Sequence, residues 1–176
     1  MAAIVRLLAL EARDLGLVER WLRAEHVRRY WGDPAPVAVE LSRLPPSARA
    51  SLIEADGRKV GLIVRQHPTR EELDVAGLHD IPETVVDIDI MVGEAAEQNR
   101  GVGRAAIRLI ANEALADPNV PLVMAATMVE NVASRRAFAA AGFSEEREFD
   151  DVPYGRCLLM TRRRGAAGGD SPKHRD

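Results

Sequence analysis

Cysteine is almost missing from this sequence, since Cys157 is the single thiol among 176 residues. An internal disulfide is therefore excluded. Because Cys157 lies in the apolar run CLLM, we interpret it as a small buried residue rather than a nucleophile. Long apolar runs are also lacking, so the sequence predicts neither a signal peptide nor a transmembrane helix. Together these absences favour a cytoplasmic protein with no membrane partner.

An excess of positive charge is lacking as well. The formal net charge is −3 and the sequence pI is about 5.9, so nucleic acid is not an expected partner. What the chain does have is 47% hydrophobic residues, enough for one globular domain with a core. We expect this domain to span residues 1–164. Residues 165–176 are glycine-rich, polar and without periodicity, which predicts a flexible tail.

Strand-type and helix-type patterns alternate along the domain. Seven segments have strand character, and they are residues 4–10, 48–55, 59–67, 85–92, 120–127, 144–149 and 156–161. Helical segments are expected at residues 14–31, 37–44, 101–116 and 131–141, with a further helical turn inside the acidic insertion 68–83. This order predicts an α/β domain, with a mixed central sheet of about seven strands and helices on both faces.

The strand at residues 85–92 carries two carboxylates. Alternation places Asp87 and Asp89 on one face, roughly 6.6 Å apart along the strand, and β-branched residues on the other face. The strand lies in the middle of the predicted order, so an exposed edge position is not expected. On an open face the two aspartates are ordinary; on a covered face they need a cationic partner or a task.

A glycine-containing loop, QNRGVGR, follows this strand and opens the next helix. Glycine lets a ligand approach the backbone closely, and the free N–H groups of a helix N-terminus favour an anion. A P-loop is excluded because Arg104 and Ala105 follow the second glycine in place of a Lys-Ser/Thr pair. A dinucleotide fingerprint needs three spaced glycines in the first βα unit, and this loop comes late.

The loop and two further motifs resemble the GNAT superfamily of acetyl-CoA-dependent N-acetyltransferases. Residues 98–103 fit the acetyl-CoA loop Gln/Arg-x-x-Gly-x-Gly/Ala, and Asn131 precedes a helix that ends in Ala-Gly-Phe. Within the superfamily the chain is most similar to aminoglycoside 6′-N-acetyltransferases, through WLRAEHVRRYWG and the Ile88-Asp89 pair before the loop. The resemblance covers essentially the whole chain before the tail and implies a GNAT-type fold.

The resemblance implies acetyl-CoA as co-substrate, no metal, and no covalent enzyme intermediate. The loop amides and the helix dipole would hold the pyrophosphate, the strand would pair with the pantetheine arm, and Asn131 would bond the arm or cap its own helix. A backbone N–H of the strand would also stabilise the charge that develops on the thioester oxygen. The residues expected to bind the cofactor are Met91, Val92, Gln98, Asn99, Arg100, Gly101, Val102, Gly103, Arg104, Ala105, Asn131 and Phe138.

The same resemblance makes Asp89 the catalytic residue and places Asp87, Asp89 and Trp31 at the acceptor. Asp89 would bind an ammonium group, orient it, and accept or relay its proton. An aspartate at its ordinary pKa is a poor base, so a water relay is favoured. Trp31 could stack on a sugar-like acceptor or pack in the core.

Two positions depart from the family pattern. Phe138 stands where many relatives have the tyrosine that protonates the leaving thiolate, and Ala126 stands where aminoglycoside-modifying relatives carry an aspartate. Each lost carboxylate weakens the case for a polycationic acceptor. Acidic side chains of the insertion could compensate, and they are Glu71, Glu72, Asp74, Asp80 and Glu83.

The sequence therefore predicts an enzyme that moves acetyl from acetyl-CoA to a primary amine of a small molecule. An aminoglycoside-like polyamine is the first candidate acceptor. A siderophore-type or lysine-like side-chain amine is the second, and a non-catalytic acyl-CoA-binding module is an alternative of another class. We expect a monomer or a homodimer.

Overall fold

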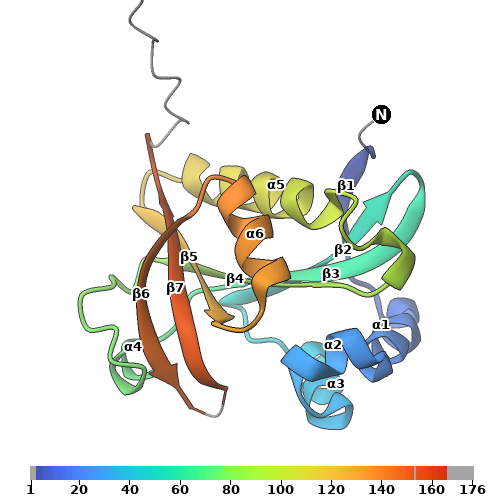
Figure 1. Ribbon diagram of the computed structural model, residues 1–176, viewed down its shortest axis with the longest axis horizontal. Helices are drawn as coiled ribbons and strands as arrows, with labels where there is room; N and C mark the ends of the chain where they lie inside the picture. Colours follow the sequence, from blue (N-terminus) through green and yellow to red (C-terminus); the bar gives the residue numbers. More distant parts are fainter. Residues whose placement is uncertain (1–2, 153, 166–176) are drawn as a thin grey trace, which may run out of the picture.

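The computed structural model describes residues 3–152 and 154–165 (Figure 1). The predicted tail lies outside the described residues except for Gly165. The strands are β1 (Val5–Ala9), β2 (Ala48–Ala55), β3 (Arg58–Gln66), β4 (Val86–Val92), β5 (Leu122–Met128), β6 (Ser144–Asp151) and β7 (Gly155–Arg163). The helices are α1 (Leu15–Arg23), α2 (Glu25–Trp31), α3 (Pro34–Ser42), α4 (Arg70–Val75), α5 (Val102–Ala116) and α6 (Val132–Ala140). Two 3-10 turns are η1 (Ala12–Asp14) and η2 (Ala95–Glu97).

One seven-stranded sheet with the order β1-β2-β3-β4-β5-β7-β6 forms the centre of the domain. Neighbouring strands run antiparallel, except that β4 and β5 run parallel. The predicted α/β class with a mixed sheet of about seven strands is confirmed. The aspartate-bearing strand β4 is internal, as its place in the predicted order indicated.

Helices cover both faces of the sheet, with α5 and α6 on one side and α1, α2 and α3 on the other (Figure 1). Val86 and Ile88 of β4 are buried against α5, in a core that includes Ile107 and Ile110. Met91 points to the opposite face and packs in the core beneath α1. The alternation of β4 thus separates an apolar face from the face that carries the two aspartates.

The first helical segment differs from the prediction. It breaks at Ala24, whose extended ψ of 133° separates α1 from α2 and changes the direction of the chain. Asp14 does not cap α1, because its carboxylate accepts hydrogen bonds from Lys59 at 2.6 Å and from the Glu11 N–H at 3.2 Å. A partly buried ion pair with β3 therefore takes the place of a local helix cap.

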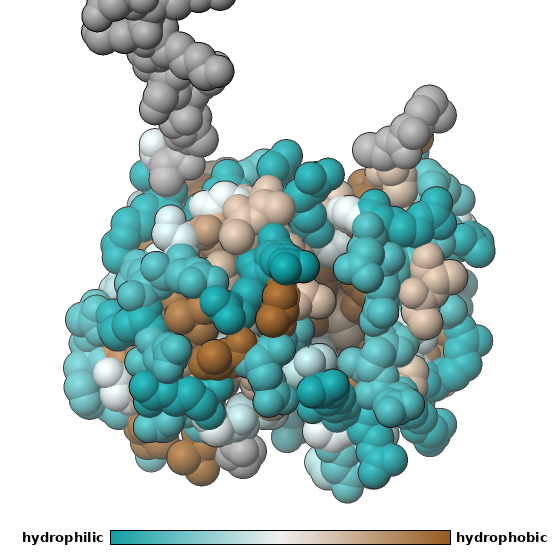
Figure 2. Space-filling model, in the orientation of Figure 1, coloured by the Kyte–Doolittle hydropathy of each residue, from teal (hydrophilic) through white to brown (hydrophobic). Residues whose placement is uncertain are grey.

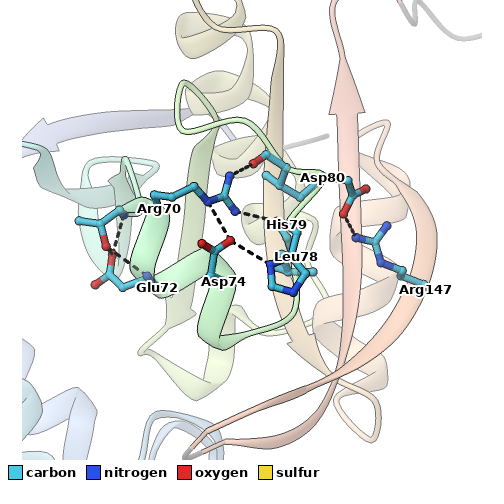
Figure 3. Close-up of polar contacts among 9 residues, drawn as sticks. Arg70, Glu72, Asp74, Leu78, His79, Asp80 and Arg147 are labelled. Carbon is cyan, nitrogen blue, oxygen red and sulfur yellow. Dashed lines mark hydrogen bonds and ion pairs between the residues drawn. The ribbon is translucent and has the colours of Figure 1, made fainter.

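The acidic insertion between β3 and β4 is an ordered layer that contains α4 (Figure 3). Arg70 donates hydrogen bonds to Asp74 and to the carbonyls of Leu78 and Ile81, while Asp80 pairs with Arg147 of β6. The apolar side chains of the insertion pack beneath the β5–β7–β6 half of the sheet, and the buried ones are Leu73, Leu78 and Ile81. The predicted helical turn is present at α4.

Candidate active site

The two parallel strands β4 and β5 diverge at the centre of the sheet. Within the described part of the chain they pair only at Val86–Val123 and Asp87–Met124, although both strands continue for several residues. Beyond Asp87, the edge of β4 therefore has no neighbouring strand. Two cavities open beside this edge, one toward α5 and α6 and the other toward the face with the aspartates.

The first cavity is a cleft of about 630 Å³ between η2, the start of α5, α6 and α2. Figure 2 shows a hollow near the centre of the face in view, with apolar surface at its floor and polar residues around its rim. Nine of the predicted cofactor residues line the cleft, and they are Met91, Val92, Gln98, Asn99, Arg100, Gly101, Gly103, Arg104 and Asn131. The strand, the loop and the asparagine are thus brought together as predicted.

The loop that starts α5 has the geometry that its glycines suggested. Asn99 and Gly101 both have positive φ, 60° and 81°, and α5 begins at Val102. The first N–H groups of an α-helix have no intrahelical partner, which leaves a short row of amides facing the cleft. The row ends at Arg104, because the Ala105 N–H donates to the Gly101 carbonyl at 3.0 Å. The Ala105 amide is therefore engaged within the helix, and the side chain of Val102 is buried in the core.

Positive charge concentrates at the mouth of this cleft. Arg104 and Arg136 line it, and Arg100 lies on the loop itself. Glu97 is 4% exposed and pairs with Arg100 at 3.2 Å and with Arg58 at 2.6 Å. One buried carboxylate between two guanidinium groups leaves a net positive charge beside the loop, which suits a phosphate group.

Asn131 lines both the cleft and the second cavity. The Asn131 side chain accepts a hydrogen bond from the Ser134 N–H at 3.1 Å, so its predicted capping role is present. Phe138 is buried, packs edge-on against Phe143 with ring centroids 5.0 Å apart, and lines the second cavity, not the first. Trp31 lines both cavities and is partly buried against the core under α1.

The second cavity, of about 300 Å³, is acidic. Asp87 and Asp89 form part of its floor, and two carboxylates that the sequence did not single out join them: Asp151 at the end of β6 and Glu40 on α3. No lysine, arginine or histidine is among the described residues that line it. Asp87 accepts a 3.4 Å hydrogen bond from Gln66, and its second oxygen is buried without a partner in the described structure.

Burial and crowding of like charges perturb these carboxyl groups. Burial, followed by the nearby charge of Asp151, raises the pKa of Asp89 to about 6. Burial, followed by the charge of Asp89, holds the pKa of Asp87 well above its ordinary value. Burial also raises the pKa of Asp151. A cationic ligand in this cavity would lower the pKa of all three carboxyl groups, because it stabilises their ionised forms.

Two further polar groups line this cavity from the β6–β7 hairpin. Burial raises the pKa of Tyr154, with the charge of Asp89 as the next cause, so its phenol stays protonated and able to donate. Cys157 is buried with a pKa raised to about 11, which agrees with its interpretation as an inert thiol.

The acids of the insertion do not compensate for Ala126. None of them is among the described residues that line the cavity; Glu72 caps α4, Asp74 pairs with Arg70, and Asp80 pairs with Arg147. The carboxylates that line the cavity beside Asp87 and Asp89 are those of Asp151 and Glu40. In the sequence, the only signal for Asp151 is its place between the strands predicted at residues 144–149 and 156–161.

Residues 11–151 match the family described as the acetyltransferase (GNAT) domain, and the chain belongs to this family. The predicted enzyme class is thereby confirmed: an acyltransferase that uses acetyl-CoA as co-substrate.

Several solved structures share the fold. The chain resembles AAC(6')-Ib bound to paromomycin and acetyl-CoA, with a TM-score of 0.79 and 21% identity over 97% of this chain and 100% of that one. A protein of Bacillus halodurans gives a TM-score of 0.79 and 16% identity over 92% and 84% of the two chains. A spermidine N-acetyltransferase chimera of the Vibrio cholerae and hSSAT proteins gives 0.66 and 16% over 90% and 94%.

No curated protein sequence matches the chain significantly. Among the described residues, no helix is both long and apolar enough to cross a membrane.

Proposed function

We propose that this enzyme transfers acetyl from acetyl-CoA to a primary amine of a small molecule that carries more than one positive charge. The observation that carries the proposal is the pairing of two cavities of opposite character along the free edge of β4. One cleft is basic at its mouth and lined by helix-start amides; the other holds four carboxylates and, among its described lining, no basic side chain.

The first cleft suits the phosphate-bearing donor. Acetyl-CoA supplies an activated acetyl group when bound. The amides of Gly101, Val102, Gly103 and Arg104 would hold its pyrophosphate, because the first N–H groups of a helix lack intrahelical partners. Gly101 and Gly103 both line the cleft, and without side chains they let a ligand approach the backbone closely.

Asp89 would bind the acceptor amine as ammonium and then take its proton. A carboxyl group whose pKa is raised to about 6 is a better proton acceptor near neutral pH than an ordinary aspartate. This environment reduces the need for the water relay that an unperturbed aspartate requires. The N–H of Val92 would donate a hydrogen bond to the acyl oxygen as negative charge develops there.

The remaining carboxylates would select the acceptor. Asp87, Asp151 and Glu40 can each pair with a further cationic group, so a polyamine is favoured over a monoamine. Structures with this fold include enzymes named for aminoglycosides and for spermidine, which are both polycationic. A lysine-like amine with a single positive charge would leave most of these carboxylates unpaired.

A panel of amines tests the proposal, with acetyl-CoA as donor and with free thiol and product mass as readouts. We expect acetylation of aminoglycosides or linear polyamines, and little or none of matched monoamines that have the same primary amine. Monoamine or lysine-type products alone would contradict the polycationic acceptor. Tight coenzyme A binding with no thiol release for any amine would instead favour a non-catalytic acyl-CoA-binding module.

A further inference from the structure

The motif WLRAEHVRRYWG places three side-chain donors along the free edge of β4. Trp31 Nε1 donates to the Ile90 carbonyl at 3.3 Å, and His26 Nε2 lies 3.0 Å from the Val92 carbonyl. Trp21 Nε1 donates to the Glu94 carboxylate at 2.8 Å, just beyond the strand. The acceptors recur every second residue, so α1 and α2 follow the edge of β4 where β5 has diverged.

The backbone hydrogen bonds explain why these carbonyls are available. The Gly93 N–H donates to the Val60 carbonyl at 2.8 Å, so the paired residues Val92 and Gly61 do not bond each other. The N–H and C=O of Val92 therefore point away from β3, toward the gap. In an extended strand Ile90, two residues earlier, points the same way.

Side chains of α2 thus take the place of a missing strand, but only for the carbonyls. Indole N–H is a donor only, and the His26 ring must donate Nε2–H to make its bond to a carbonyl. The N–H groups of Ile90 and Val92 are left facing the gap. A carbonyl of β4 without a hydrogen bond would repel the acyl oxygen, which becomes negative during acyl transfer. The hydrogen bonds from α2 to these carbonyls reduce that repulsion.

We propose that His26 and Trp31 are positioning residues for acyl transfer, which hold residues 90–92 of β4 so that the edge offers hydrogen-bond donors to the acyl group. This inference rests on the proposed function, because it concerns the step that Asp89 and the Val92 N–H carry out. It assigns a role to the histidine and the second tryptophan of the motif.

The chain provides a matched control. His67 Nδ1 lies 2.9 Å from the Val85 carbonyl, so it makes the same kind of bond beside the other end of β4, and it lines neither cavity. His26→Leu and His67→Leu each delete one imidazole-to-carbonyl bond next to the same strand. His26→Gln keeps a side-chain hydrogen-bond donor at residue 26.

In acetyl transfer assays we expect His26→Leu to lower kcat between about tenfold and a hundredfold, because small displacements of reacting groups have effects of this size. The KM for the amine should stay within about twofold, His26→Gln should recover part of kcat, and His67→Leu should match the wild type. Trp31→Phe, which keeps an aromatic ring but loses the indole N–H and its 3.3 Å bond, should have a smaller effect of the same kind.

Hydrogen exchange supplies a readout that does not depend on turnover. Amides of residues 89–93 should exchange faster in His26→Leu than in His67→Leu, while thermal midpoints stay similar. Equal exchange and equal kcat in the two variants would overturn the inference, as would a His26→Leu variant that keeps its kcat and binds coenzyme A more tightly. Faster exchange in His26→Leu, with no amine-dependent thiol release even from the wild type, would count against the proposed function, and would still show that His26 holds residues 89–93 of the strand edge in place.

Discussion

Replacing Asp151 with asparagine should lower the pH at which acetyl transfer becomes efficient. Asp151 and Asp89 come from strands at different places in the sheet and line the same acidic cavity. Burial is the first cause that raises the pKa of Asp89 to about 6, and the charge of Asp151 is the second. The substitution removes the second cause and keeps the first.

The expected pH profile follows from these causes. Asp89 must be ionised to accept a proton, so kcat/KM of the wild type should rise with pH through about 6 and fall about tenfold between pH 7 and pH 5. In Asp151→Asn the inflection should move to lower pH while staying above the ordinary aspartate value of 3.8, since burial remains. Activity at pH 5 should therefore be a larger fraction of the activity at pH 7.

The assay is initial-rate thiol release from acetyl-CoA at subsaturating amine, from pH 4.5 to pH 8. Ionisation of the free amine adds its own slope, but that slope is identical for both enzymes and cancels in their ratio. A ratio that stays constant with pH would refute the coupling between Asp151 and Asp89. An inflection that moves to higher pH would refute its sign.

Four further substitutions test the site and the packing around it. Gly103→Val should abolish coenzyme A binding measured by calorimetry, because the valine methyl groups extend beyond a Cβ that is already in contact with Val92 at 3.7 Å and would crowd the cleft that Gly103 lines. Glu97→Gln should weaken coenzyme A binding several-fold and leave binding of phosphate-free acetyl-pantetheine unchanged, because Arg100, which lines the cleft, and Arg58 lose the carboxylate that holds them in place. Gly93→Ala would place a Cβ 2.1 Å from the buried ring of Trp21 and should destabilise the fold by about 2 kcal/mol or more, measured by denaturant unfolding. Asp89→Asn should abolish transfer yet raise the free energy of unfolding at pH 8 by up to about 3 kcal/mol, because a raised native pKa contributes stability below pH 4 that is lost as the pH rises through 6.

Glu94 provides a control for Glu97. Glu94→Gln alters a carboxylate on the same loop, bonded to Arg20 and Trp21, which lies outside the cleft lining; it should not change coenzyme A affinity. Equal losses in Glu94→Gln and Glu97→Gln would contradict the specific role of Glu97. A variant of Asp89 that is less stable at pH 8 than the wild type would contradict the raised pKa of that carboxyl group.

Most secondary structure could be predicted because it depends on local spacing. The two-residue period of β4 separates Val86 and Ile88 from Asp87 and Asp89 whatever surrounds the strand. The helix break at Ala24 could not be predicted in this way, since no proline or glycine marks it. The ion pair of Asp14 with Lys59 of β3 could not be predicted either, because it joins residues that are far apart in the sequence.

The glycine loop before α5, the carboxylate pair on β4 and the family resemblance could be read from the amino-acid sequence, because each depends on residues close together in the chain. Long-range packing sets which other groups join them. It brings Asp151 and Glu40, more than 45 residues from Asp89 on either side, into one cavity, and lays α2 along the edge of β4. Burial and like charge act through space, so the raised pKa of Asp89 arises from packing and not from its sequence neighbours.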